Sequence, residues 1–125
     1  MRKFWAFGAA ALLAGCVSTP DVNGGSWGAP SLAALQQMCG LPAVNYADDA
    51  QPVYSALFDA YVASHRGRVS KDDFCAFQSA IAQQYAALGT SHDPQVRGQW
   101  AVFFNEQRAR ALSWRSFVDP TLRAG

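Results

Sequence analysis

Apolar residues recur at spacings of three and four along most of the chain, and this period constrains the fold more than any other feature. An α-helix makes one turn in 3.6 residues, so residues spaced in this way share one face and can be buried together. No stretch shows sustained alternation of apolar and polar residues with β-branched side chains. The sequence therefore predicts an all-α fold, a small helical bundle of about four helices.

Residues typical of helix ends bracket the four periodic segments. The first helix is expected over residues 32–39, and the last is expected to extend toward Phe117 before Asp119 and Pro120 break it. Side chains or rings suited to a helix start are Ser31, Pro52, Ser70 and the pair Asp93-Pro94. The glycines expected to end helices are Gly40, Gly67 and Gly89.

The first fifteen residues have the layout of a secretory signal. Arg2 and Lys3 precede an apolar run from Phe4 to Leu13, and the chain turns polar after it. A membrane-spanning helix needs roughly 20 apolar residues, and this run has about half of them.

The end of that run, Leu13-Ala14-Gly15-Cys16, resembles the lipobox of bacterial lipoproteins. The resemblance implies cleavage before Cys16, attachment of diacylglycerol to its sulfur and, usually, acylation of the new amino terminus. Two or more acyl chains anchor a protein stably, whereas one holds it marginally. Val17 stands where enteric lipoproteins retained in the inner membrane carry aspartate. The resemblance therefore implies an outer-membrane address on the periplasmic side.

Composition divides the chain into three parts. Residues 1–15 are the expected signal peptide, residues 16–30 the lipidated cysteine and a flexible tether rich in Gly, Pro, Ser and Asn, and residues 31–125 the helical domain. Without residues 1–15, eight basic side chains (ten less Arg2 and Lys3) oppose nine acidic ones, for a net charge of about −1. We expect no nucleic-acid partner, and we expect membrane contact through the lipid on Cys16.

With Cys16 lipidated, two cysteines remain, Cys39 and Cys75. Export places them in an oxidising compartment, where a lone pair usually forms a disulfide. Closure of a loop of about 36 residues would stabilise the fold by roughly 3–4 kcal/mol on the chain-entropy model. A buried free pair or a reactive thiol is the alternative, although neither cysteine lies in the CxxC context that favours redox chemistry.

One segment resembles the second half of an EF-hand calcium loop, Gly67 to Phe74. The first, third and fifth ligand positions of such a loop would be Val62, Ser64 and Arg66. An apolar side chain and a cation cannot hold a hard dication that prefers oxygen ligands. The segment is better interpreted as a turn between two helices.

Motifs for metal, cofactor or catalytic chemistry are missing from the sequence. The only histidines, His65 and His92, have no second His or Cys at ligand spacing, and Glu106 is the only glutamate. No serine stands in a G-x-S-x-G motif, and no glycine loop could hold a phosphate. We expect no metal, no cofactor and no enzymatic activity.

The C-terminal segment carries the candidate partner-binding residues Arg108, Arg110, Trp114, Arg115 and Phe117. Arginine and large aromatic residues are enriched at binding hot spots. In the alternative, Trp114 and Phe117 complete the core while the arginines face water.

These observations favour a non-catalytic protein-binding or scaffolding module, anchored in the outer membrane and contacting another envelope protein. In one form of this hypothesis, the chain is similar to secretion-system pilotins, which are small helical lipoproteins with an internal disulfide. The similarity is one of architecture, without a shared sequence motif. An enzyme acting on an envelope polymer would need a pocket holding Glu106 or a histidine with a strongly shifted pKa. A carrier of small ligands would need a large apolar cavity between helices.

Overall fold

A computed structural model describes residues 22–23 and 28–119, and every regular element within these ranges is helical. The elements in chain order are α2 (Leu32–Met38), the 3₁₀ turn η2 (Ala47–Asp49), α3 (Ala50–His65), α4 (Lys71–Gln84), the π-helical turn η3 (Tyr85–Gly89) and α5 (Pro94–Ser116). The predicted all-α bundle is confirmed. The expected signal, Cys16 and most of the expected tether lie outside the described residues.

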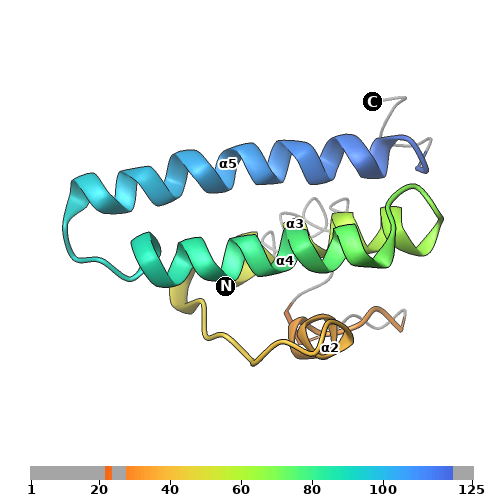
Figure 1. Cartoon of the computed structure of the whole chain (residues 1–125), viewed down its shortest axis with the longest axis horizontal. Helices are drawn as coiled ribbons and strands as arrows, with labels where there is room; N and C mark the ends of the chain where they lie inside the picture. Colours follow the sequence, from red (N-terminus) through yellow and green to blue (C-terminus); the bar gives the residue numbers. More distant parts are fainter. Residues whose placement is uncertain (1–21, 24–27, 120–125) are drawn as a thin grey trace, which may run out of the picture.

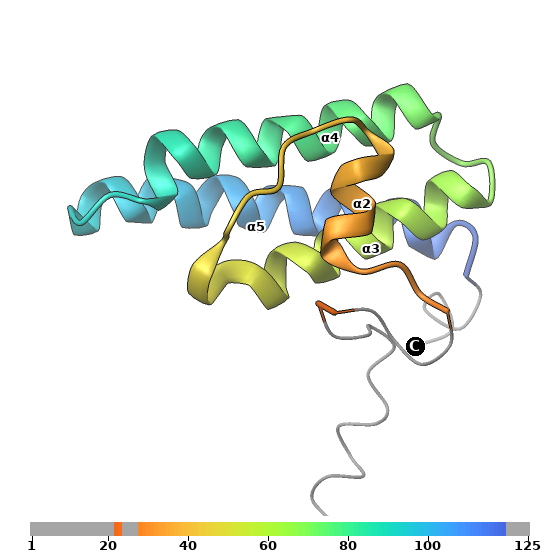
Figure 2. The ribbon, with the colours of Figure 1, turned by 90° about the horizontal axis from the view of Figure 1, so that it is seen from below.

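Three long helices run side by side, and the short helix α2 lies across them. Figure 1 shows α3, α4 and α5 alternating in direction, joined by short turns, with α2 seen end-on below them. In Figure 2, α2 crosses in front of α3, and the connector that follows it returns along the bundle to the start of α3. The crossing helix and its connector thus cover one side of a three-helix bundle.

The core lies where α3, α4 and α5 face one another. The central helix α3 buries the apolar side of every turn, and Val53, Leu57 and Ala60 are fully inaccessible to solvent. Helix α5 adds Trp100 and Phe104, whose rings stack at a centroid distance of 5.2 Å. Helix α2 contributes Leu35 and is only seven residues long. A helix this short is not stable alone, so its packing against the bundle maintains it.

The predicted helix starts hold in the structure. Ser31 Oγ accepts a hydrogen bond from Ala34 N at 3.0 Å, and Ser70 Oγ accepts one from Asp73 N at 3.0 Å. The carboxylate of Asp93 does the same for α5, whose first residue is a proline. These contacts satisfy N–H groups that the first turn of a helix leaves without partners.

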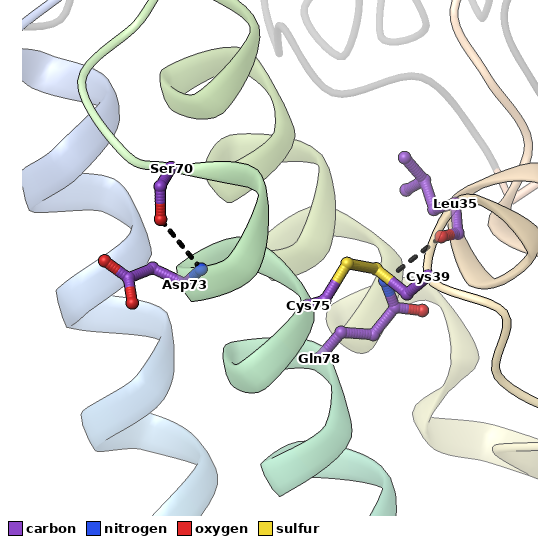
Figure 3. Close-up of a disulfide and its surroundings, with 6 residues drawn as sticks. All are labelled: Leu35, Cys39, Ser70, Asp73, Cys75 and Gln78. Atoms are coloured by element: carbon purple, nitrogen blue, oxygen red, sulfur yellow. Dashed lines mark hydrogen bonds between the residues drawn. A yellow bond between two sulfur atoms is a disulfide. The ribbon is translucent and has the colours of Figure 1, made fainter.

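The predicted disulfide joins Cys39 and Cys75, with Cα atoms 5.4 Å apart. Cys39 caps the end of α2, and Cys75 lies near the start of α4. Figure 3 shows the bridge beside Gln78, whose amide nitrogen is turned toward the carbonyl of Leu35. The bridge and this hydrogen bond both attach the crossing helix α2 to α4.

Two elements differ from the expectation. Pro52 is predicted at the start of the second helix, but α3 begins at Ala50 and the 3₁₀ turn η2 precedes it, so Pro52 stands third in the helix, still within the first turn. The third helix was expected to run to Gly89, but its last turn, η3, is π-helical. The ring of Tyr85 lies against the backbone at Gly89, where any Cβ would collide with it. The glycine is therefore required by close packing, not by a left-handed backbone.

Candidate functional site

The five C-terminal residues predicted to bind a partner do not form one surface. Arg115 is 7% exposed, and its Nη1 donates to Asp59 Oδ1 at 2.8 Å while its Nε lies 3.4 Å from Asp119 Oδ2. Burial raises the pKa of Asp59 above its ordinary value, and this desolvation outweighs the opposing hydrogen bond and charge of Arg115. Arg115 thus joins α5 to α3 inside the protein.

The other four residues lie in three places, with Arg110 and Trp114 together. Trp114 is half-buried, and the guanidinium of Arg110 lies 4.6 Å from the centre of its ring. Phe117 is 54% exposed, with the guanidinium of Arg68 3.8 Å from its ring centre. Arg108 lines a cleft of about 240 Å³ between α3 and α5. Two aromatic rings therefore already carry an arginine from the same chain, and the predicted hot spot is dispersed.

Glu106 and the two histidines also lie apart from one another. Glu106 is exposed on α5, His92 is exposed in the turn before α5, and His65 is exposed at the end of α3, where it stacks on Tyr61. Across residues 22–23 and 28–119, no three His, Cys, Asp or Glu side chains gather in a group that could hold a metal ion.

The structure instead presents a cleft that sequence reasoning missed, between the connector after α2 and the outer side of α4. Its volume is about 310 Å³. One wall consists of the connector residues Leu41, Pro42 and Val44. The other wall consists of residues from α4 and η3, namely Ser79, Ala82, Gln83 and Ala86. The walls are mainly apolar, and Tyr46 also lines the cleft.

Three buried polar side chains form the floor of this cleft. Gln36 comes from α2, Tyr46 from the end of the connector and Gln78 from α4, and all three are at most 4% exposed. Gln36 Nε2, Tyr46 Oη and Gln78 Oε1 have no hydrogen-bond partner among the described residues. In that part of the chain only one other buried side-chain nitrogen or oxygen, Arg115 Nε, is in this state. Buried polar groups are nearly always paired, so three unpaired ones in one cleft indicate a site for something polar.

Neighbouring contacts fix the hydrogen-bonding character of two of these groups. Gln78 Nε2 donates to Leu35 O at 3.1 Å, which leaves the amide oxygen as the acceptor on the other side. Burial raises the pKa of Tyr46 to about 12, with a smaller contribution from nearby Tyr85. The Tyr46 hydroxyl therefore keeps its proton at neutral pH and can donate. Gln36 adds N–H donors.

The turn that positions Tyr46 is strained. The next residue, Ala47, has a φ of 53°, in the left-handed region that residues with a Cβ seldom adopt. Asn45 Oδ1 accepts from Ala47 N at 2.9 Å and supports this conformation. Strain of this kind clusters at functional sites. The π-helical turn η3, which carries Ala86, is a second rare element beside the same cleft.

The connector itself has free main-chain groups. Within the described ranges, residues 42–45 make no main-chain hydrogen bond to other main-chain atoms, and they belong to no helix. Pro42, Ala43 and Asn45 are exposed. Figure 2 shows this stretch passing openly alongside α4. One wall of the cleft thus offers main-chain donors and acceptors as well as apolar side chains.

The lining of the cleft is uncharged at neutral pH. Tyr46 is the one ionisable side chain among its lining residues, all of which belong to the described ranges, and it stays protonated. A neutral ligand with an apolar body and a few polar atoms fits such walls and such a floor.

The helical pattern of the sequence alone does not identify this site. Gln36 and Gln78 are polar residues within helices, and a helical pattern assigns such residues to the solvent side. Tyr46 stands in a connector without any period. The sequence does place Gln36 and Gln78 next to apolar helix positions, and this was the available signal. The path of residues 41–46 decides which segment covers these two side chains, and the sequence pattern does not reveal that path.

No protein-family model, no curated protein and no solved structure matches this chain. None of the helices in the described part of the chain is both long and apolar enough to cross a membrane.

Proposed function

We propose that this chain is a non-catalytic protein-binding module of the bacterial cell envelope, anchored by lipid on Cys16 at the periplasmic face of the outer membrane. Its binding site is the cleft lined by Gln36, Tyr46 and Gln78. The observation that carries the binding role is the concentration of unpaired, buried polar atoms in one open, uncharged cleft.

The energetics of the floor support this role. A buried polar group without a hydrogen bond destabilises a protein by about 1–3 kcal/mol. Three such groups in one place are a large fraction of the stability of a domain of this size, which is of the order of 5–15 kcal/mol. A ligand that pairs with these groups would recover part of that free energy on binding.

The sequence supports the proposed location at the membrane. The basic start, the short apolar run and Leu13-Ala14-Gly15-Cys16 together have the layout of a lipoprotein signal. A stretch of fifteen residues, 16–30, would reach at most about 50 Å. The cleft would therefore meet partners that lie close to the membrane.

Site-specific photocrosslinking in the native bacterium tests the binding site. A photoreactive amino acid replaces Ala82, in the cleft wall, and a matched variant carries it at Ala101, which is exposed on α5. We expect a discrete crosslinked envelope protein from position 82 and none from position 101. Equal crosslinking from both positions, or none from position 82, would contradict the proposal.

Mass spectrometry of the protein isolated from membranes tests the proposed lipid anchor. We expect a chain that begins at Cys16 and carries the mass of acyl chains on that residue. A Cys16→Ser variant is the matched control and should accumulate uncleaved. An unmodified thiol at position 16 in the native protein would contradict the proposed anchor.

A further inference from the structure

We infer that the cleft binds an extended peptide segment, so that one peptide group and a neighbouring apolar side chain of a partner protein enter it. This inference rests on the proposed function, because it names the part of the partner that is recognised. Three features carry it: the floor groups, the absence of charge on the lining side chains and the open main chain of the connector.

The floor groups complement a peptide amide. Such an amide has a carbonyl oxygen, which accepts hydrogen bonds, and an N–H, which donates one. Tyr46 Oη and Gln36 Nε2 can donate to the carbonyl oxygen, and Gln78 Oε1 can accept from the N–H. The floor therefore offers donors suited to the carbonyl end of an amide and an acceptor suited to its N–H end.

Charge excludes the common alternatives. The described residues that line the cleft include no Lys, Arg, His, Asp or Glu. A carboxylate or phosphate would lose its hydration there without gaining an opposite charge. A plain hydrocarbon, such as an acyl chain, would fill the walls but leave the three floor groups unpaired. A neutral amide with an apolar side chain satisfies both the walls and the floor.

The connector favours a peptide over a small amide. Residues 42–45 present main-chain groups that are not bonded to any other described main-chain group. An extended peptide can pair with such a segment as an added strand does, with alternate side chains directed into the cleft. Leu41 and Val44 would then contact the apolar side chain that enters.

Entry requires a small adjustment of the walls. Each of the three floor atoms has less than 1 Å² of accessible surface. A ligand reaches them when side chains of the walls move apart, and side-chain rotations of this kind are common on binding. The flexible side chains of Leu41 and Gln83 lie at opposite walls. The floor is therefore covered in the free protein and paired in the bound one.

The experiment uses two small probes that differ in one atom pair. N-acetyl-leucine methylamide has the N–H of a peptide, and N-acetyl-leucine methyl ester has an oxygen in its place. Each is titrated into the ¹⁵N-labelled full chain, as the cell produces it, held in lipid nanodiscs, and amide chemical shifts are recorded. Empty nanodiscs report the partition of each probe into lipid.

We expect the amide probe to bind with a Kd in roughly the millimolar range, as small ligands do, with shifts confined to residues 36, 41–46 and 78–86. The ester should bind about threefold to tenfold more weakly, because it leaves Gln78 Oε1 unpaired. Tyr46→Phe should weaken amide binding by a similar factor. Tyr54→Phe is the matched control, since Tyr54 is equally buried but its hydroxyl donates to Pro30 O, and binding should be unchanged.

Equal affinity for amide and ester, shifts outside the cleft, or unchanged binding by Tyr46→Phe would each overturn the inference. These outcomes differ from failure of the proposed function. Crosslinking from position 82 with no amide preference would retain a protein-binding module and reject the peptide-group contact. Amide-selective binding without any crosslinked protein would retain the chemistry of the cleft and reject the protein partner.

Discussion

Two buried tyrosines allow the unpaired state of the cleft floor to be measured. Tyr46 is 1% exposed and Tyr54 is fully buried, so removal of the hydroxyl is the same chemical change in equally dry surroundings. Tyr46 Oη has no partner among residues 22–23 and 28–119, whereas Tyr54 Oη donates to Pro30 O at 2.6 Å. We predict that Tyr46→Phe leaves the protein as stable as before or more stable, and that Tyr54→Phe destabilises it.

The magnitudes follow from these two environments. An unpaired buried hydroxyl opposes folding by about 1–3 kcal/mol, and its removal leaves a small void that returns part of this gain. We expect Tyr46→Phe to change the free energy of unfolding by between about 0 and +2 kcal/mol. Tyr54→Phe loses a net hydrogen bond and leaves a half-buried carbonyl without that donor, a loss of about 1–2 kcal/mol. The two variants should therefore differ by about 1–4 kcal/mol.

Urea unfolding followed by circular dichroism measures both variants against the wild type. For a domain of this size, 1 kcal/mol corresponds to a Tm change of about 4–8 °C, so the difference is well resolved. The slope of free energy against urea should be equal in all three proteins. A loss of 1 kcal/mol or more in Tyr46→Phe would show that its hydroxyl has a partner in the free protein. The cleft floor would then be paired before any ligand binds, which contradicts its proposed role.

Three further perturbations test other parts of the structure. The double variant Cys39→Ala/Cys75→Ala removes a bridge between residues 36 positions apart, and urea unfolding should show that the free energy of unfolding falls by about 3–4 kcal/mol. A fall of less than about 1 kcal/mol would contradict a stabilising role of the disulfide. Burial raises the pKa of Asp59 above 3.8, so the contribution of this carboxyl to stability is complete below that pH and is lost as pH rises through the raised pKa. The free energy of unfolding of the wild type should therefore fall relative to that of Asp59→Asn over this rise in pH, whereas the exposed control Asp72→Asn should show no such trend against the wild type. Ala47 has a φ of 53°, in the left-handed region that glycine tolerates better, so Ala47→Gly should raise the free energy of unfolding by about 0.5–1 kcal/mol in the same assay. A lower free energy of unfolding in this variant would show that the turn is not strained.

The helices could be predicted from sequence because their determinants are local. Ser70 and Asp93 cap helices through atoms two or three residues away, and Pro94 fits a first turn whatever surrounds it. The pairing of Cys39 with Cys75 needed only a count of cysteines and an oxidising compartment. These predictions hold because they do not depend on how distant segments pack together.

The predicted surface was harder because contact between helices decides exposure. Arg115 lies on the last turn of α5, where sequence alone cannot distinguish a solvent-facing arginine from one that meets Asp59 on α3. A separation of 56 residues divides the two. No sequence pattern pairs Arg115 with Asp59, since both residue types are usually exposed. Phe117 stays 54% exposed, but its contact with Arg68 is likewise between residues far apart in the sequence.

The disulfide and the unpaired floor are best understood together. Gln78 Nε2 lies 3.1 Å from Leu35 O and 3.5 Å from Cys39 Sγ, so the bridge and the cleft floor share one small region. Without a covalent link, α2 could move away from α4, and water could then pair with Gln36 and Gln78. The bridge opposes this relaxation, because its covalent bond holds the end of α2 beside the start of α4. A cleft floor kept unpaired in the free protein is pre-organised for a ligand, and pre-organisation raises affinity by reducing what binding must still arrange.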